Sequence, residues 1–149
     1  TSSPSSEAMR SLLAGLKPIV SGKSEIDAVN ILLRFVQTAF EYRTDQEQFG
    51  REKPFFLEET LYYPFSDCED RSILFAYLIR KVLGLDVVAL DYPAHIATAV
   101  RFGSNVSGDA VTFQGTRYVI CDPTYIYANA GNCMPQFKTV SPNIIKFIN

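Results

Sequence analysis

Residues 66–90 read SDCEDRSILFAYLIRKVLGLDVVAL and carry the signals of a helix start, a helix end and a strand. Two overlapping N-cap signatures, Ser66-Asp-Cys-Glu69 and Asp67-Cys-Glu-Asp70, precede a run of apolar side chains. These recur at helical spacing up to Gly84, a typical helix-ending residue, and are Ile73, Leu74, Tyr77, Leu78 and Val82. The next apolar run, Val87–Leu90, has the length of a short buried strand. The segment therefore predicts a buried helix with Cys68 in its first turn, followed by a strand.

The region before this segment predicts two more helices. A short helix fits Glu7–Leu16 and is expected to stop at Pro18, because proline breaks a helix interior. A capping box at Ser24-Glu-Ile-Asp27 then starts a helix of residues 26–42. Its polar positions are Asp27, Asn30, Arg34, Gln37 and Glu41, which leave a wide apolar face for the core. From Thr44 to Phe65 the pattern gives a polar loop and then an aromatic-rich stretch.

The region after the segment changes to strand patterns. His95–Val100 reads as a second strand, and Ala110–Phe113 with Arg117–Cys121 as a hairpin around Gly115. From Tyr125 the chain is expected to be irregular until a possible closing strand at 143–148. Helices first and antiparallel strands later indicate an α+β fold.

Composition describes one ordinary globular domain. The chain has 149 residues, of which 47% are hydrophobic, and we expect residues 1–6 to be a linker and 7–149 a single domain. A net charge of −2 without a long basic run argues against nucleic-acid binding. Charged residues interrupt the longest apolar stretch, so no membrane span is expected. One histidine and three cysteines without a C-x-x-C pair argue against a zinc site, and no cofactor motif is evident.

The first residue, Thr1, is not methionine, which suggests a processed or excised chain. We therefore expect further domains of a larger parent chain, and we favour an exported location over the cytoplasm. Cys121 is expected to fill the core, because it faces away from its neighbour Asp122 on a strand. For Cys133, a free thiol and a disulfide both remain open.

Three residues have the chemistry of a thiol active site. A thiol nucleophile needs a thiolate, a base in contact with it and a third group that orients the base. A helix N-terminus stabilises the thiolate of Cys68, and His95 is the only imidazole in the sequence. Asp122 ends a later strand, and adjacent strands can bring this carboxylate to the imidazole.

The same residues resemble the transglutaminase-like superfamily, which is related to the papain-like cysteine peptidases. The resemblance covers about residues 26–134. It rests on Asp67-Cys-Glu-Asp70 at a helix start, His95 at the head of a strand, and Tyr118-Val-Ile-Cys-Asp-Pro-Thr124.

The resemblance implies a fold in which N-terminal helices and the nucleophile helix pack on a small antiparallel sheet. It implies that Cys68 is the nucleophile, His95 the general base and acid, and Asp122 the orienting carboxylate. Some members use a tryptophan to assist the oxyanion. This chain has none, so Tyr62 or Tyr63 is the candidate for that role. The expected activity is hydrolysis of a peptide or carboxamide bond in a peptide or protein substrate, through a thioester.

Three other functions stay open from the sequence. Transamidation of protein glutamine shares every step up to the thioester, and only the acceptor differs. A non-catalytic peptide- or protein-binding module, or a purely structural domain, would keep the fold without the chemistry.

Overall fold

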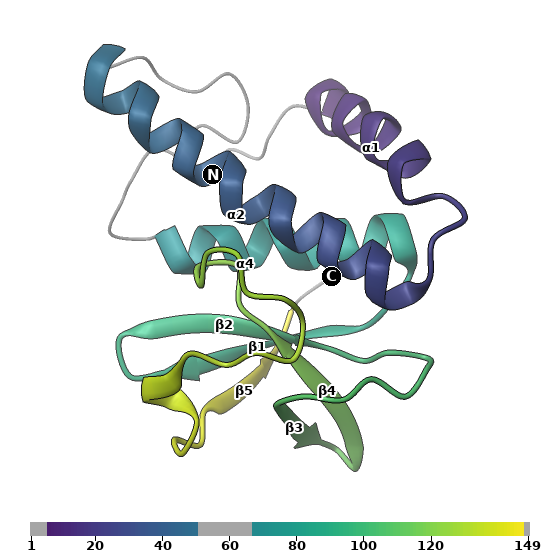
Figure 1. Ribbon diagram of the computed structural model, residues 1–149, viewed down its shortest axis with the longest axis vertical. Helices are drawn as coiled ribbons and strands as arrows, with labels where there is room; N and C mark the ends of the chain where they lie inside the picture. Colours follow the sequence, from purple (N-terminus) through teal and green to yellow (C-terminus); the bar gives the residue numbers. More distant parts are fainter. Residues whose placement is uncertain (1–5, 51–66, 148–149) are drawn as a thin grey trace.

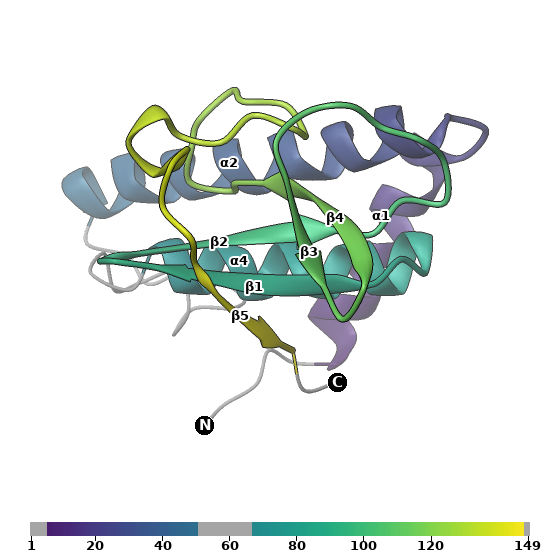
Figure 2. The same ribbon diagram turned by 90° about the horizontal axis from the view of Figure 1, so that it is seen from below.

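The computed structural model describes residues 6–50 and 67–147, and the side chains of residues 7–39 and 68–147. These residues form a mixed α+β structure in which three α-helices lie on one side of a five-stranded antiparallel sheet (Figure 1). Helix α4 packs against both α2 and β2, and the view from below places it behind β1 and β2, with α2 beside it (Figure 2). The α+β class predicted from the sequence is thus confirmed.

The two N-terminal helices are longer than the sequence pattern predicts. Helix α1 spans Ser6–Val20 and continues through Pro18, so the expected stop there is wrong. Proline 18 falls near the end of the helix, and the following Val20 is buried in the core, which holds the last turn in place. Helix α2 spans Glu25–Gly50 and includes positions from Thr44 that were expected to form a loop. Residues 44–49 contain no proline or glycine and several good helix formers, so the helix persists without an apolar stripe.

Helix α4 spans Asp67–Leu78 and continues as a π-helical turn, η2, over Ile79–Leu83. Gly84 ends it in the left-handed conformation, with φ 70°, as the sequence predicts. The buried face differs in part from the predicted stripe. Ile73 is 49% exposed, whereas Phe75 and Ile79 are fully buried, because the core lies against a neighbouring face of the helix.

The strands follow the predicted pattern closely. They are β1 (Val87–Tyr92), β2 (His95–Val100), β3 (Ala110–Phe113), β4 (Thr116–Cys121) and β5 (Asn143–Lys146), in the order β3-β4-β2-β1-β5. The β3–β4 hairpin turns at Gln114 and Gly115, which both have positive φ, the backbone of a tight two-residue turn. Between β4 and β5 the structure adds a short 3₁₀-helix, η3 (Pro135–Phe137).

Both faces of the sheet are covered. Between helices and sheet lies the larger core, which includes Leu32, Leu33, Phe75, Leu78, Val100 and Cys121. The opposite face carries a second cluster around Leu90, Tyr92 and Ile120, covered by the segment from Cys133 to Ile144. Residues at the ends of β2 and β4, which include His95 and Asp122, therefore have packed neighbours on both faces of the sheet.

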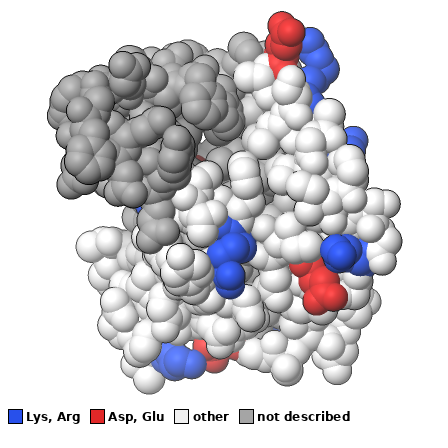
Figure 3. Space-filling model, turned by 45° about the horizontal axis from the view of Figure 1, so that its top comes forward, with Lys and Arg blue, Asp and Glu red and all other residues white. Residues whose placement is uncertain are grey.

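Charged side chains do not gather on the face that Figure 3 shows. Basic and acidic side chains are scattered over the face in Figure 3 without a continuous patch of either sign among the described residues. None of the helices, within the residues that were searched, combines the length and the apolar character that a bilayer crossing requires.

Two glycines in close backbone contact join the loops beside β4. A Cβ added at Gly108, where φ is 124°, would lie 2.6 Å from the Cα of Gly131. At Gly115, φ is also positive, at 78°, but nothing lies within 4 Å, so this residue is a control for a positive-φ glycine without a close contact. We expect Gly108→Ala to reduce the free energy of unfolding by about 2 kcal/mol more than Gly115→Ala. Urea unfolding of both variants measures this, and equal losses would contradict the proposed close contact.

Candidate active site

Cys68 lies in the first turn of α4, as the sequence predicts. Its Sγ accepts a hydrogen bond from the backbone N–H of Ile96 on β2 at 3.4 Å. One turn later, Ser72 donates from its hydroxyl to the carbonyl of the same Ile96 at 3.5 Å. The backbone N–H and carbonyl of Ile96 thus both face α4, and these two bonds hold the thiol of Cys68 beside the start of β2.

His95 begins β2, directly after the turn from β1, where it pairs with Tyr92. Its ring stacks on Phe137 of η3, with centroids 5.0 Å apart and planes 7° apart. Phe137 in turn packs on Tyr92, with ring centroids 4.7 Å apart. The side chain of His95 is 9% exposed, so its neighbours leave little of the imidazole accessible to solvent.

Asp122 follows the last residue of β4 and is 2% exposed. Its Oδ2 lies 2.7 Å from Nε2 of His95, and its Oδ1 accepts from the backbone N–H of Thr124 at 2.9 Å. The contact arises because β2 and β4 are antiparallel neighbours with Thr98 opposite Cys121, so the end of β4 lies beside the start of β2. The juxtaposition expected from strand order is therefore present.

Cys68 and His95 perturb each other electrostatically. A hydrogen bond from His95 lowers the pKa of the Cys68 thiol from its ordinary 9.0, although burial acts in the opposite direction. Burial also opposes the charged form of His95. Hydrogen bonds to Asp122 and Cys68 outweigh burial and raise the pKa of the imidazole from 6.5 to about 9. With Nε2 on Asp122, Nδ1 is the ring nitrogen left for the thiol. These directions favour a thiolate–imidazolium pair near neutral pH.

The other two cysteines have no such partner among the described side chains. Cys121 is fully buried in the larger core, and burial raises the pKa of its thiol. Cys133 is 5% exposed and its Sγ lies 4.0 Å from the hydroxyl of Tyr92; burial raises its pKa as well. All three cysteines are free thiols, so the open question of a Cys133 disulfide is answered for this structure.

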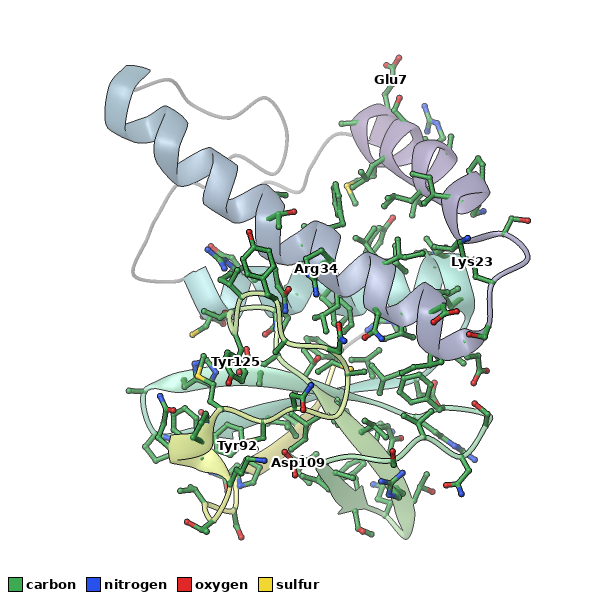
Figure 4. The ribbon with its side chains drawn as sticks, in the orientation of Figure 1. Glu7, Lys23, Arg34, Tyr92, Asp109 and Tyr125 are labelled. Carbon is green, nitrogen blue, oxygen red and sulfur yellow. The ribbon has the colours of Figure 1, made fainter. Side chains whose placement is uncertain are left out.

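The polar side chains on α2 contribute to the site in a way the sequence analysis did not identify. Gln37 is completely buried and binds the backbone of the loop that follows Asp122, and Arg34 and Asn30 bind the same loop further along. Figure 4 shows this region, with Arg34 on α2 and Tyr125 in the loop. The spacing of these polar residues in the sequence places them on one face of α2. It does not indicate which part of the chain they bind.

Tyr62 and Tyr63, the predicted oxyanion donors, and the aromatic stretch around them lie outside the described residues, as does Ser66. Among the residues searched, no group of three or more His, Cys, Asp or Glu side chains is arranged to hold a metal ion. The described site thus consists of a thiol, an imidazole, a carboxylate and the backbone that holds them. No family model, curated protein or solved structure matches this chain.

Proposed function

We propose that this domain is a cysteine-dependent amidohydrolase or peptidase of the transglutaminase-like type, with a papain-like arrangement of its site. The observation that supports it most is the 2.7 Å contact between Nε2 of His95 and Oδ2 of the buried Asp122. The interaction of the same imidazole with Cys68, which lowers the pKa of the thiol, supports it further. Each residue has the partner that its role requires: the thiol an imidazole, and the imidazole a buried carboxylate. A structural cysteine needs neither.

In the proposed reaction, the thiolate of Cys68 attacks the carbonyl carbon of a peptide or carboxamide. The negative charge that develops on the oxygen is stabilised by the backbone N–H of Cys68, one of the N–H groups that a helix start leaves unpaired. The imidazolium of His95 donates its proton to the departing amine, and the C–N bond breaks to leave a thioester.

The thioester is then resolved by water. Neutral His95 takes a proton from the attacking water, the C–S bond breaks, and the acid product leaves with the thiolate restored. Asp122 keeps the ring oriented and stabilises its charged form throughout. We propose hydrolysis rather than transamidation, because so small a domain has little structure with which to exclude water from the thioester.

The first test measures the reactivity of the individual thiols. We expect iodoacetamide to alkylate Cys68 at least tenfold faster than Cys133 at about pH 6.5, because only Cys68 has a lowered pKa. Peptide mass spectrometry assigns the rate to each cysteine.

His95→Ala is the matched variant for this test. It should reduce the rate at Cys68 about tenfold or more and leave Cys133 unchanged, because the imidazolium is the main cause of the lowered thiol pKa. If Cys68 reacts no faster than Cys133 and His95→Ala has no effect, the catalytic proposal is rejected and a non-catalytic module is favoured instead.

A further inference from the structure

Gln37 is the one large polar side chain among the fully buried residues described, and it lies in the middle of a core helix. Its Nε2 lies within hydrogen-bond distance of three backbone carbonyls, those of Asp122 at 3.1 Å, Tyr125 at 2.9 Å and Ala128 at 3.1 Å. Its Oε1 accepts from the backbone N–H of Tyr127 at 2.9 Å. The amide therefore joins both ends of the loop from 122 to 128 to α2.

The orientation of this amide is determined by its partners. Arg34, one turn earlier on α2, donates from Nε to Oε1 of Gln37 at 3.2 Å. The nitrogen side meets only carbonyl oxygens and the oxygen side meets only N–H donors, so a flipped amide would lose these bonds. Gln37 is thus held in one arrangement, and the loop is held with it.

The loop contains a backbone conformation that needs such support. Tyr127 has φ 70°, which is unusual for a bulky residue, and unlike Ala94 and Gln114 it does not lie in a two-residue hairpin turn. Gln37 binds its N–H, and Arg34 binds its carbonyl through Nη2 at 3.1 Å. A residue in this conformation persists only where its surroundings fix it. Without Gln37 the loop would relax, and the relaxation would reach Asp122.

Asp122 depends on that support, because strand pairing holds it from one side only. Before it, Cys121 pairs with Thr98 of β2, and Thr98 also donates from its hydroxyl to the carbonyl of Cys121 at 2.6 Å. After it, the chain leaves the sheet. The Asp122 carbonyl accepts from Gln37 and from the backbone N–H of Tyr125 at 3.2 Å, and Arg71 of α4 donates to the carbonyl of Pro123 at 3.5 Å. Tyr125 lies in the loop that Gln37 itself binds. The carboxylate that binds His95 is thus attached to a backbone held by β2 on one side and, on the other, by Gln37 together with these bonds.

We propose that Gln37 is a positioning residue of the site: it fixes the backbone of Asp122, and through that carboxylate it maintains the imidazolium of His95 and the thiolate of Cys68. The proposal rests on the function proposed above. It assigns a role to a residue that touches none of the reacting atoms.

The test compares Gln37→Leu with Asn30→Ala. Asn30 lies on the same face of α2 and accepts from the backbone N–H of Ala130 at 2.8 Å, so it binds the chain just beyond this loop rather than at Asp122. We expect Gln37→Leu to lower the pKa of His95 by about one unit and the alkylation rate of Cys68 by iodoacetamide near pH 6.5 about tenfold. Asn30→Ala should leave both values unchanged. NMR titration of the only histidine measures the pKa directly.

Arg34→Met is the second variant, for the case that Gln37→Leu does not fold. It removes one of the bonds to the Gln37 amide, together with the bonds of Arg34 to Tyr127 and Asn129, but it leaves the bond from Gln37 to the Asp122 carbonyl. Its shifts should therefore be smaller but of the same sign. The positioning role would be overturned if Gln37→Leu folds and its His95 pKa is unchanged, or if Asn30→Ala shifts the His95 pKa and the Cys68 rate equally. If Gln37→Leu does not fold, an unchanged His95 pKa in Arg34→Met would overturn it. A wild-type Cys68 that reacts no faster than Cys133 would instead reject the proposed function.

Discussion

Asp122→Asn is expected to lower the pKa of His95 from about 9 to below 7 and to slow alkylation of Cys68 near pH 6.5 up to about a hundredfold. The hydrogen bond and charge of Asp122 are the main favourable contributions to the imidazolium. An asparagine keeps the size of the side chain but removes the charge, and burial then favours the neutral ring. With less imidazolium, the ion pair is less populated and the thiol becomes harder to ionise. Turnover of an amide substrate should fall further, roughly 10³-fold or more, because the ring also loses its fixed tautomer.

Asp109→Asn is the matched control. The Asp109 carboxylate also has defined partners, Lys138 Nζ at 2.9 Å and the backbone N–H of Cys133 at 3.0 Å, but it has no bond to His95. We expect this variant to leave the titration of His95 and the reactivity of Cys68 unchanged. An His95 pKa that stays near 9 in Asp122→Asn would show that the carboxylate does not support the imidazolium, and the proposed triad would fail.

The positions of the three site residues were predictable because each sits at the end of a regular element. Capping residues around Asp67 fix the helix start and hence Cys68, and turn signals bracket the strands that carry His95 and Asp122. Antiparallel pairing of neighbouring strands then brings the start of one to the end of the other. The predicted contact between His95 and Asp122 required only that β4 lie next to β2, and the two strands are neighbours in the structure.

The role of Gln37 was not predictable in the same way. A polar residue at helical spacing normally marks a solvent-exposed face, and Gln37 follows Asn30 and Arg34 in such a pattern. Its burial depends on an irregular loop 85 to 91 residues downstream, and no periodicity describes where such a loop lies. The same reason explains Ile73, which fits the predicted stripe of α4 but lies outside the core. Which of two neighbouring helix faces is buried depends on what packs there.

Cys68→Ala is expected to make the stability of the domain depend on pH between about 6.5 and 9, where the wild-type pair contributes little dependence. The raised pKa of His95 gives stability that is complete below 6.5 and is lost as pH rises towards 9. The lowered pKa of Cys68 gives stability that is complete above 9.0 and is lost as pH falls through its folded value. Where the pH is above both 6.5 and the folded pKa of Cys68 and below 9, the folded pair carries one proton, on His95, and the unfolded chain also carries one, on Cys68. Folding of the wild-type pair then takes up no net proton.

Removal of the thiol breaks this balance. In Cys68→Ala the folded imidazole still binds a proton through Asp122, whereas the unfolded one loses it above 6.5, so the free energy of unfolding should fall as pH rises. The slope can reach about 1.4 kcal/mol per pH unit, and the total is at most about 3 kcal/mol, because the His95 pKa is lower without Cys68. Urea unfolding at several pH values measures it, with Cys133→Ala as the control that removes a buried thiol elsewhere and should keep the wild-type profile. Parallel profiles for the wild type and Cys68→Ala would mean that His95 and Cys68 exchange no proton on folding, and a thiol that remains protonated at neutral pH cannot be the nucleophile proposed here.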